Sequence, residues 1–186
     1  MGQDIINPKP LGYQEFVTAV RKAAEVYGER LFIVVGRGSL SASMPEASEG
    51  LRMTGDIDLF APFQEDKIDA WSAADLLVSV ESPFFVDHGF YIERVGEWTL
   101  ISQPSGWQER GLSLKVDEID VLVLHPLDLA YNKLEAGRSK DIDFMREGLS
   151  SGAYKLAEVE AFIRANAPDD ATRELILANL NQAVSS

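Results

Sequence analysis

The sequence predicts an α+β fold, in which a sheet-bearing N-terminal region is followed by a helical C-terminal region. Short apolar segments bounded by Gly, Pro and Ser recur up to residue 124, as is typical of strands. After Pro126, apolar residues recur at helical spacing and the segments end at Gly or Pro. The 186 residues suit one domain, or one domain with a small appendage. We therefore divide the chain into residues 1–125 and 126–186.

The N-terminal region is expected to begin with a helix and two strands. Residues 11–29 carry apolar side chains at helical spacing and end near Gly28. Residues 31–35 are entirely apolar, as in a buried strand, and residues 56–60 form a second strand candidate. Residues 36–55 between them are rich in turn-forming residues, and such a stretch inside a domain is usually functional.

Further along, the pattern predicts one helix and several strands. Residues 66–80 predict an amphipathic helix with Asp66 near its start, and residues 84–102 predict a hairpin that turns at Gly96. Residues 111–116 and 119–124 are two more strand candidates. The core side of the helix is expected to hold Ile68, Trp71, Leu76 and Leu77.

Four helices are expected in the C-terminal region. Gly137, Gly152 and Pro168 separate the segments, because glycine ends helices and proline does not continue them. The four predicted helices are residues 127–136, 141–149, 156–165 and 170–184.

Charge and composition exclude several classes of protein. The 30 acidic and 17 basic residues leave a net charge of −13, which argues against a protein that coats nucleic acid non-specifically. The absence of cysteine excludes a disulfide framework, a thiolate zinc site and a cysteine nucleophile. No stretch reaches the roughly 18 to 20 apolar residues that span a bilayer, and the first ten residues lack the apolar run of a signal peptide. We expect a soluble cytoplasmic protein that does not bind a membrane.

Two aspartates on one strand are the strongest candidates for chemistry. Side chains alternate between the faces of a strand, so Asp56 and Asp58 point the same way, roughly 7 Å apart at the backbone. Ile57 and Leu59 occupy the other face. Two carboxylates beside a sharp turn form a hard oxygen site suited to Mg²⁺ or Mn²⁺.

The turn Gly36–Ser39 comes before this strand. Its glycines would let backbone N–H groups approach a phosphate, and Ser39 would supply a hydroxyl. Two aspartates one residue apart are also common on a solvated edge strand, and for that pair alone we favour the solvated strand. The combination of an apolar strand, a Gly-Ser turn and two aspartates within an apolar strand favours a metal and phosphate site.

This combination resembles the nucleotidyltransferase fold of the DNA polymerase beta superfamily, which implies a mixed sheet flanked by helices. The likeness to one bacterial family of nucleotidyltransferase-like proteins covers roughly residues 30–150. It rests on residues 34–47, 56–62, 104–110, 124–130 and 132–144. The block D-L-A-x-x-K-L-x-A-G-R-x-K-D, residues 128–141, is similar to a segment of the AbiEii-type toxin nucleotidyltransferases, which are relatives of the minimal nucleotidyltransferases of toxin–antitoxin pairs.

The resemblance implies roles for further residues. Lys133 and Asp141 match essential active-site residues of the AbiEii-like enzymes, and the helical C-terminal region would complete the site. Lys133 with Arg138 or Lys140 would neutralise the triphosphate of a nucleotide. The residues expected to cradle that triphosphate are Gly36, Arg37, Gly38 and Ser39, with Arg37 standing where the family more usually has serine. A surface corner in which Lys140 and Asp141 merely pair is the alternative from composition alone.

A third carboxylate normally completes such a site. Asp120 is our choice as a catalytic residue and metal ligand, because it is a lone acid entering an apolar strand, and Asp117 is the alternative. Trp98 and Trp107 are interpreted as core or lip residues, although either could stack on a base.

The expected function is a metal-dependent nucleotidyltransferase that transfers a nucleoside monophosphate from a nucleoside triphosphate. The resemblance implies an RNA or protein hydroxyl as acceptor, and a cognate toxin or antitoxin as partner. Two alternatives stay open, because fold analogy does not separate them. One is a nucleotide-binding or protein-interaction module that has lost turnover, and the other is a small-molecule nucleotidyltransferase of the antibiotic-modifying type.

Overall fold

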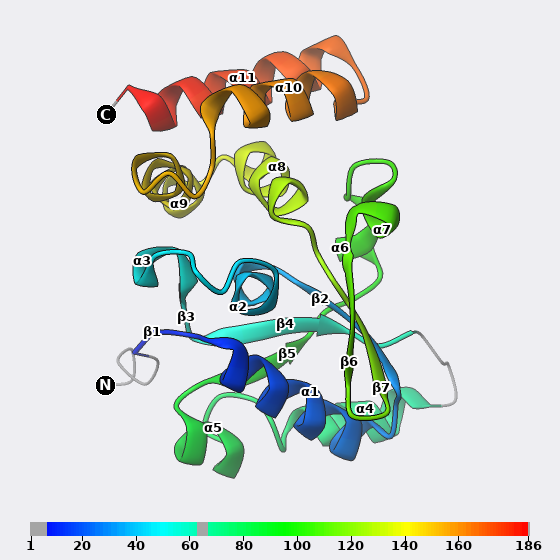
Figure 1. Cartoon of the computed structure of the whole chain (residues 1–186). Helices are drawn as coiled ribbons and strands as arrows, with labels where there is room; N and C mark the ends of the chain where they lie inside the picture. The colour runs from blue at the N-terminus through cyan, green and yellow to red at the C-terminus, as the bar shows by residue number, and fades with distance from the viewer. Residues whose placement is uncertain (1–6, 63–66, 186) are drawn as a thin grey trace.

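A mixed five-stranded sheet lies at the centre of the computed structural model, which describes residues 7–62 and 67–185 (Figure 1). The strand order is β5-β4-β2-β7-β6, in which β4 runs parallel to β5 and β2 runs parallel to β7, while the other neighbours are antiparallel. The five strands are β2 (Leu31–Val35), β4 (Asp56–Phe60), β5 (Tyr91–Arg94), β6 (Leu112–Val116) and β7 (Ile119–Val123). A separate two-stranded ribbon joins β1 (Lys9–Pro10) to β3 (Met53–Thr54). The predicted α+β class and mixed sheet are confirmed.

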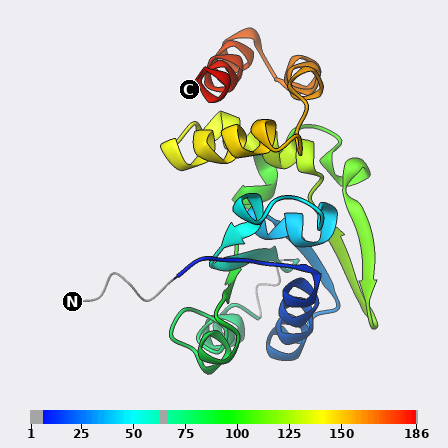
Figure 2. The same ribbon diagram turned by 60° about the vertical axis from the view of Figure 1, so that its left-hand side comes forward.

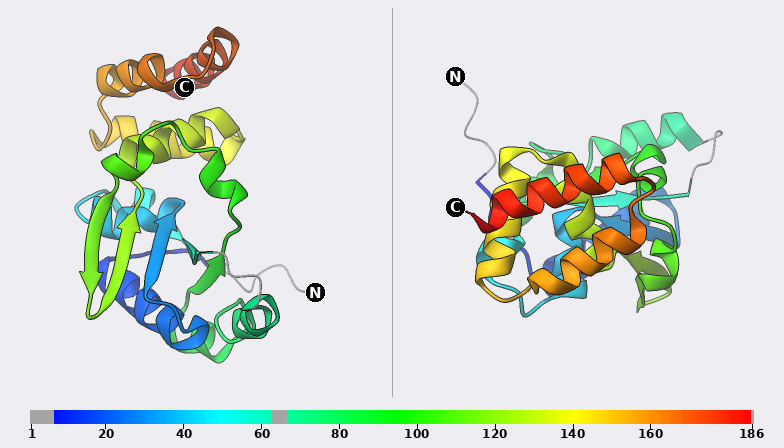
Figure 3. Two further views of the ribbon diagram at one scale, coloured as in Figure 1. Left: turned by 90° about the vertical axis from the view of Figure 1, so that its right-hand side faces the viewer. Right: turned by 90° about the horizontal axis from the view of Figure 1, so that it is seen from above.

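Helices cover both sides of this sheet (Figure 1). On one side lie α1 (Tyr13–Tyr27), α4 (Ile68–Asp75) and α5 (Pro83–His88). On the other lie α8 (Pro126–Ala136), α9 (Ser139–Ser150), α10 (Leu156–Asn166) and α11 (Asp170–Val184). Short helical turns connect the layers: η1 (Arg37–Ser39), α2 (Leu40–Ser43), α3 (Glu49–Arg52), α6 (Trp98–Ile101) and α7 (Trp107–Arg110). Figure 2 shows the C-terminal helices and α1 still on opposite sides after rotation, and Figure 3 shows α10 and α11 outermost when seen from above.

Two hydrophobic clusters fill the two sides of the sheet. The first includes α1 and α4 with Ile57 and Leu59 of β4. The second joins the C-terminal helices to Val35 at the end of β2. Because side chains alternate along a strand, Asp56 and Asp58 lie on the face of β4 opposite to the first cluster. The second cluster draws on residues from both sides of residue 125, and the division of the chain there stays a prediction.

The predicted C-terminal helices are confirmed, with small shifts at their ends. Pro126 occupies the first turn of α8, and the His125 side chain accepts a hydrogen bond from the Leu127 N–H at 3.2 Å. The helix ends at Gly137, whose φ of 59° is left-handed. Among the described residues, no helix is long and apolar enough to cross a bilayer.

The predicted hairpin over residues 84–102 is wrong. Ser82 caps α5 by accepting a hydrogen bond from the Phe85 N–H, and Gly89 ends that helix in a left-handed conformation. The chain then forms β5, which pairs with β4 in parallel and does not fold back on itself. Alternating apolar residues identified β5 as a strand, but they do not specify the strand with which it pairs.

The predicted helix over residues 66–80 is shorter in the structure. α4 ends at Asp75, Trp71 is buried as expected, and the predicted start at Asp66 lies outside the described residues. Three side chains assigned to the core are instead exposed, namely Ile68, Leu76 and Leu77.

Candidate active site

Three carboxylates from two neighbouring strands form a cluster on the face of the sheet toward α8. Asp56 and Asp58 come from β4, and Glu93 comes from β5, where it pairs directly opposite Asp58. One oxygen of each carboxylate lies within 4.8 Å of the others. The placement of Asp56 and Asp58 on one face agrees with the predicted alternation, whereas Glu93 was not identified from the sequence.

Asp56 is held by neighbours at both of its carboxylate oxygens. The Thr54 hydroxyl donates to Oδ1 at 2.6 Å, and the Tyr91 hydroxyl donates to Oδ2 at 3.2 Å. Burial, followed by the nearby charge of Asp56, raises the pKa of Tyr91, so its hydroxyl stays protonated as a donor. The two hydrogen bonds fix the orientation of the Asp56 carboxylate toward the cluster.

Asp58 is in a different environment from Asp56. Burial, followed by the charges of Asp56 and Glu93, raises the pKa of Asp58 to about 7, although Lys133 and Lys140 act in the opposite direction. A carboxyl group that resists ionisation beside two other acids is typical of a site built for an added positive charge.

The raised pKa of Asp58 predicts an unusual pH dependence of stability for the metal-free protein. Because the folded pKa of about 7 exceeds the ordinary aspartate value of 3.8, the stabilising contribution of this group is complete below about pH 4 and is lost as the pH rises through about 7. Between pH 4 and pH 8, with a chelator present, we expect the free energy of unfolding of wild type to fall by up to about 4 kcal/mol relative to that of Asp58→Asn. Urea unfolding of both proteins across this range measures the difference, and parallel pH profiles would contradict it.

Gly36 lets the chain turn directly beneath Asp58. Its φ is 63°, and a Cβ at this position would lie 1.9 Å from Oδ2 of Asp58. Glycine is therefore required here both for its positive φ, which is combined with a ψ of −166°, and for the close approach of the carboxylate. The Gly36 carbonyl accepts hydrogen bonds from the N–H and the hydroxyl of Ser39, at 3.3 and 2.8 Å.

Only two of the four turn residues predicted to cradle a triphosphate line the cleft. Gly36 and Arg37 line the cleft, but Gly38 and Ser39 are buried and do not. A Cβ at Gly38 would lie 3.1 Å from the Cα of Ile57, so the turn packs tightly on β4. The predicted phosphate contact of the Ser39 hydroxyl is not brought to the cleft, since this hydroxyl donates to Gly36.

Arg37 links three parts of the structure. Its Nη1 donates to the Met53 carbonyl at 2.7 Å, and its guanidinium lies 4.9 Å from the centre of the Phe144 ring. Burial lowers the pKa of Arg37, although the charges of Asp141 and Asp56 oppose the shift. The guanidinium is thus a fixed positive charge between β3 and α9.

Asp141 binds two of the predicted cations together. Lys133 Nζ lies 3.3 Å from Oδ1 of Asp141, and Arg138 donates to Oδ2 at 2.5 Å. Asp141 is only 1% exposed, and burial alone would raise its pKa, but the bond from Arg138 and the charge of Lys133 outweigh it and lower the pKa. Burial lowers the pKa of Lys133 against the attraction of Asp141. Asp141 therefore positions Lys133, which is half-buried, on the wall of the cleft.

One cleft of about 960 Å³ brings these groups together. Its floor carries Asp56, Asp58 and Glu93, and its cationic wall consists of Arg37, Lys133, Arg138 and Lys140. Arg94 also lines the cleft, but its guanidinium is paired with Asp75. One face of α8 lines the cleft at helical spacing, with Leu129, Asn132, Lys133 and Ala136. The volume is in the range of ligand-binding clefts.

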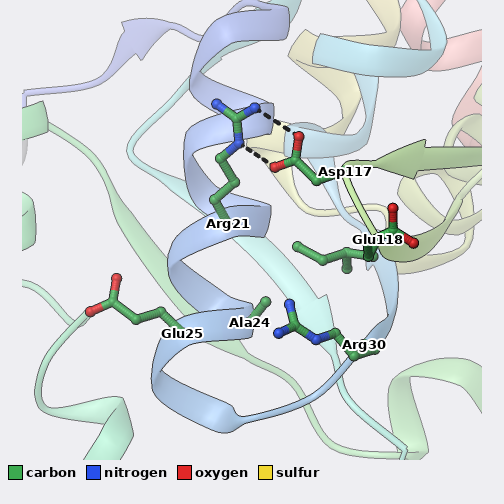
Figure 4. A pocket seen from close by; sticks show the side chains of 7 residues that line it. Arg21, Ala24, Glu25, Arg30, Asp117 and Glu118 are labelled. Atoms are coloured by element: carbon green, nitrogen blue, oxygen red, sulfur yellow. Dashed lines mark hydrogen bonds and ion pairs between the residues drawn. The ribbon is translucent and has the colours of Figure 1, made fainter.

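Asp120 and Asp117 lie at the other end of the sheet. Asp120 pairs opposite Leu31 at the start of β2, whereas Asp58 pairs opposite Val35 at its end, about 13 Å further along the strand. Asp120 is exposed and forms an ion pair with Lys115 at 3.2 Å. Figure 4 shows Asp117 beside Arg21 of α1, which donates to it at 2.9 and 3.1 Å. Neither residue belongs to the carboxylate cluster, and its third acid is Glu93.

Comparison with known proteins identifies the family. The family model of a nucleotidyltransferase of unknown function (DUF6036) matches residues 14–181, a range that includes every cleft residue named above. No curated protein and no solved structure matches the chain. The match covers most of the chain, from α1 into α11, and the chain therefore belongs to the DUF6036 family of nucleotidyltransferases.

Proposed function

We propose that the chain is a metal-dependent nucleotidyltransferase that uses the cleft between the sheet and α8. One observation carries this proposal: three clustered carboxylates face a wall of four cations across a single cleft. A nucleoside triphosphate bound with a divalent cation has the complementary arrangement of charge. Membership of the DUF6036 family supports the same class of reaction.

The donor set fits a hard divalent cation. Asp56, Asp58 and Glu93 offer only carboxylate oxygens, which are the ligands that Mg²⁺ and Mn²⁺ prefer. When bound, such an ion would neutralise phosphate charge and lower the pKa of an attacking hydroxyl.

The residues of the cleft divide the remaining work. Lys133, Arg138 and Lys140 would neutralise the β- and γ-phosphates, with Asp141 holding Lys133 and Arg138 in place. The acceptor oxygen would bond to the α-phosphorus as the bond to the bridging oxygen breaks. Pyrophosphate would leave with that electron pair, and the acceptor proton would pass to a carboxylate of the floor.

The acceptor that we propose is a hydroxyl of RNA or of a protein. Support comes from the resemblance of residues 128–141 to AbiEii-type enzymes, which also suggests a partner in a toxin–antitoxin pair. The net charge of −13 disfavours a large RNA footprint and makes a protein hydroxyl the first acceptor to test.

The proposal is tested by nucleotide binding and by label transfer. Calorimetry with each ribonucleoside triphosphate, in Mg²⁺ and in EDTA, measures metal-dependent binding. Transfer from α-labelled nucleotides is then measured with total RNA, with cell protein and with the chain itself as acceptors. Lys133→Met is expected to weaken nucleotide binding by about 10- to 100-fold, because a charge-assisted contact contributes about 1.5–3 kcal/mol. Lys155→Met, which removes an exposed lysine at the start of α10, is the matched control and should bind as wild type.

Each outcome separates the alternatives. Metal-dependent binding with transfer to any acceptor supports the enzyme. Metal-dependent binding without transfer favours the two alternatives, namely a nucleotide-binding module that has lost turnover or an enzyme that uses a small-molecule acceptor. Absence of nucleotide binding, or equal binding by Lys133→Met and wild type, contradicts the proposed site.

A further inference from the structure

The two ends of the cleft differ in chemistry. At the C-terminal end of α8 lie Lys133, Arg138 and Lys140, which are all cationic. On the side of α6, the lining includes Trp98, Thr99, Ser102 and Gln103, none of which is charged. Figure 1 shows α6 and α9 on opposite sides of α8. A nucleoside triphosphate has the same polarity, with a charged chain at one end and an uncharged heterocycle at the other.

Trp98 presents an aromatic surface at the uncharged end. It lines the cleft and is 74% exposed, whereas Trp71 and Trp107 are both buried. A Cβ at Gly96 would lie 2.7 Å from Nε1 of Trp98, so the indole rests directly against the Gly96 backbone. Glycine at this position lets the ring lie close to the chain while most of its surface stays open.

Two residues that line the same cleft, Thr99 and Asn132, hold buried polar atoms without hydrogen-bond partners among the described residues. Asn132 of α8 donates from Nδ2 to Oε1 of Gln103 at 2.6 Å, and Gln103 donates to the Thr99 carbonyl at 2.9 Å. The Asn132 Oδ1 and the Thr99 Oγ1 are buried and have no hydrogen-bond partner in the described structure. Because buried polar atoms normally have partners, these two favour a ligand whose polar edge enters the seam between α6 and α8.

We propose that Trp98 is the stacking platform for the base of the nucleotide, with Asn132 and Thr99 at the edge of that base. This inference rests on the proposed function, since it assigns the nucleoside end of the same cleft. With the phosphates on the cationic wall and the cation site on the floor, the base extends toward α6. Stacking on an indole contributes about 1–3 kcal/mol per base.

The test compares nucleotides with a ligand that has the phosphates and no base. Dissociation constants in Mg²⁺ are measured for the four ribonucleoside triphosphates and for inorganic tripolyphosphate. Trp98→Ala is expected to weaken binding of at least one nucleoside triphosphate about tenfold, while tripolyphosphate binds unchanged, and Trp98→Phe should restore most of the loss. Ile101→Ala, which removes another exposed side chain of α6 outside the cleft lining, is the control and should match wild type.

Fluorescence gives a second readout that does not depend on turnover. Trp98 is the exposed tryptophan of the three, so iodide quenching reports mainly on it, and a bound nucleotide should protect it while tripolyphosphate does not. Unchanged nucleotide binding by Trp98→Ala, or equal weakening of nucleotide and tripolyphosphate, overturns the assignment even if transfer persists. A raised KM for the acceptor with unchanged nucleotide binding also overturns it, because Trp98 would then contact the acceptor. If wild type binds neither nucleoside triphosphates nor tripolyphosphate, both this inference and the proposed function are contradicted.

Discussion

Glu93→Gln is expected to abolish metal-dependent nucleotide binding and to lower transfer by at least about 100-fold. The substitution keeps the shape of the side chain but removes one of the three negative charges of the cluster. A loss of about 2.7 kcal/mol of charge stabilisation corresponds to this factor, and a metal contributes several kcal/mol at such sites. Titration of Mn²⁺ by electron paramagnetic resonance measures the metal affinity directly, and the transfer assay measures turnover.

Asp120→Asn is the matched control, because it makes the same chemical change at the other end of the sheet. Asp120 is exposed and paired with Lys115, so the variant should bind metal and transfer nucleotide as wild type does. If instead Asp120→Asn is inactive and Glu93→Gln is unaffected, Asp120 is the third metal ligand, as the sequence predicted, and the cluster with Glu93 is not the metal site.

Gly36→Ala is expected to destabilise the fold by about 2–6 kcal/mol and to remove metal binding without altering any ligand. With φ 63° and ψ −166°, Gly36 lies in a backbone region essentially restricted to glycine, which costs a residue with a Cβ about 1–3 kcal/mol, and overpacking costs about 1–3 kcal/mol. The new methyl group would overlap Oδ2 of Asp58, so the carboxylate must leave its place in the cluster. Urea unfolding gives the stability change, and Mn²⁺ titration gives the effect on the site.

Gly28→Ala separates these two effects. Gly28 also has a positive φ, 71°, although in the αL region, and nothing lies within 4 Å of a Cβ built on it. This variant should lose only about 1–2 kcal/mol and should bind metal normally. If Gly36→Ala behaves in the same way as Gly28→Ala, the close approach of Gly36 to Asp58 has no effect on the site.

Local pattern predicted the central part of the fold well. The apolar run 31–35, strand 56–60 and helix 170–184 lie where the sequence placed them, because each has a clear local signal. The first is a short continuous apolar run, the second alternates, and the third has apolar residues at helical spacing. Alternation within strand 56–60 also predicted that Asp56 and Asp58 share a face. These properties depend on residues close together in the chain.

The rest of the site depends on how distant strands pair. Glu93 meets Asp58 only through the parallel register of β5 on β4, which no local signal encodes. A lone acid in an apolar strand made Asp120 the better candidate, but the register of β7 on β2 places it at the far end of the sheet. The burial of Ser39 likewise follows from packing of the turn on β4.

The position of β5 in the sheet has a consequence for how long the site stays assembled. β5 is one of the two edge strands of the five-stranded sheet, and on its outer side the Ile92 N–H donates to the Val78 carbonyl of the α4–α5 connection. Edge elements open more readily than central ones, often without unfolding the remainder. Such an opening would carry Glu93 away while Asp56 and Asp58 stay on β4. The lifetime of the complete cluster is therefore governed by local unfolding at one margin of the sheet, and not by the global stability of the chain.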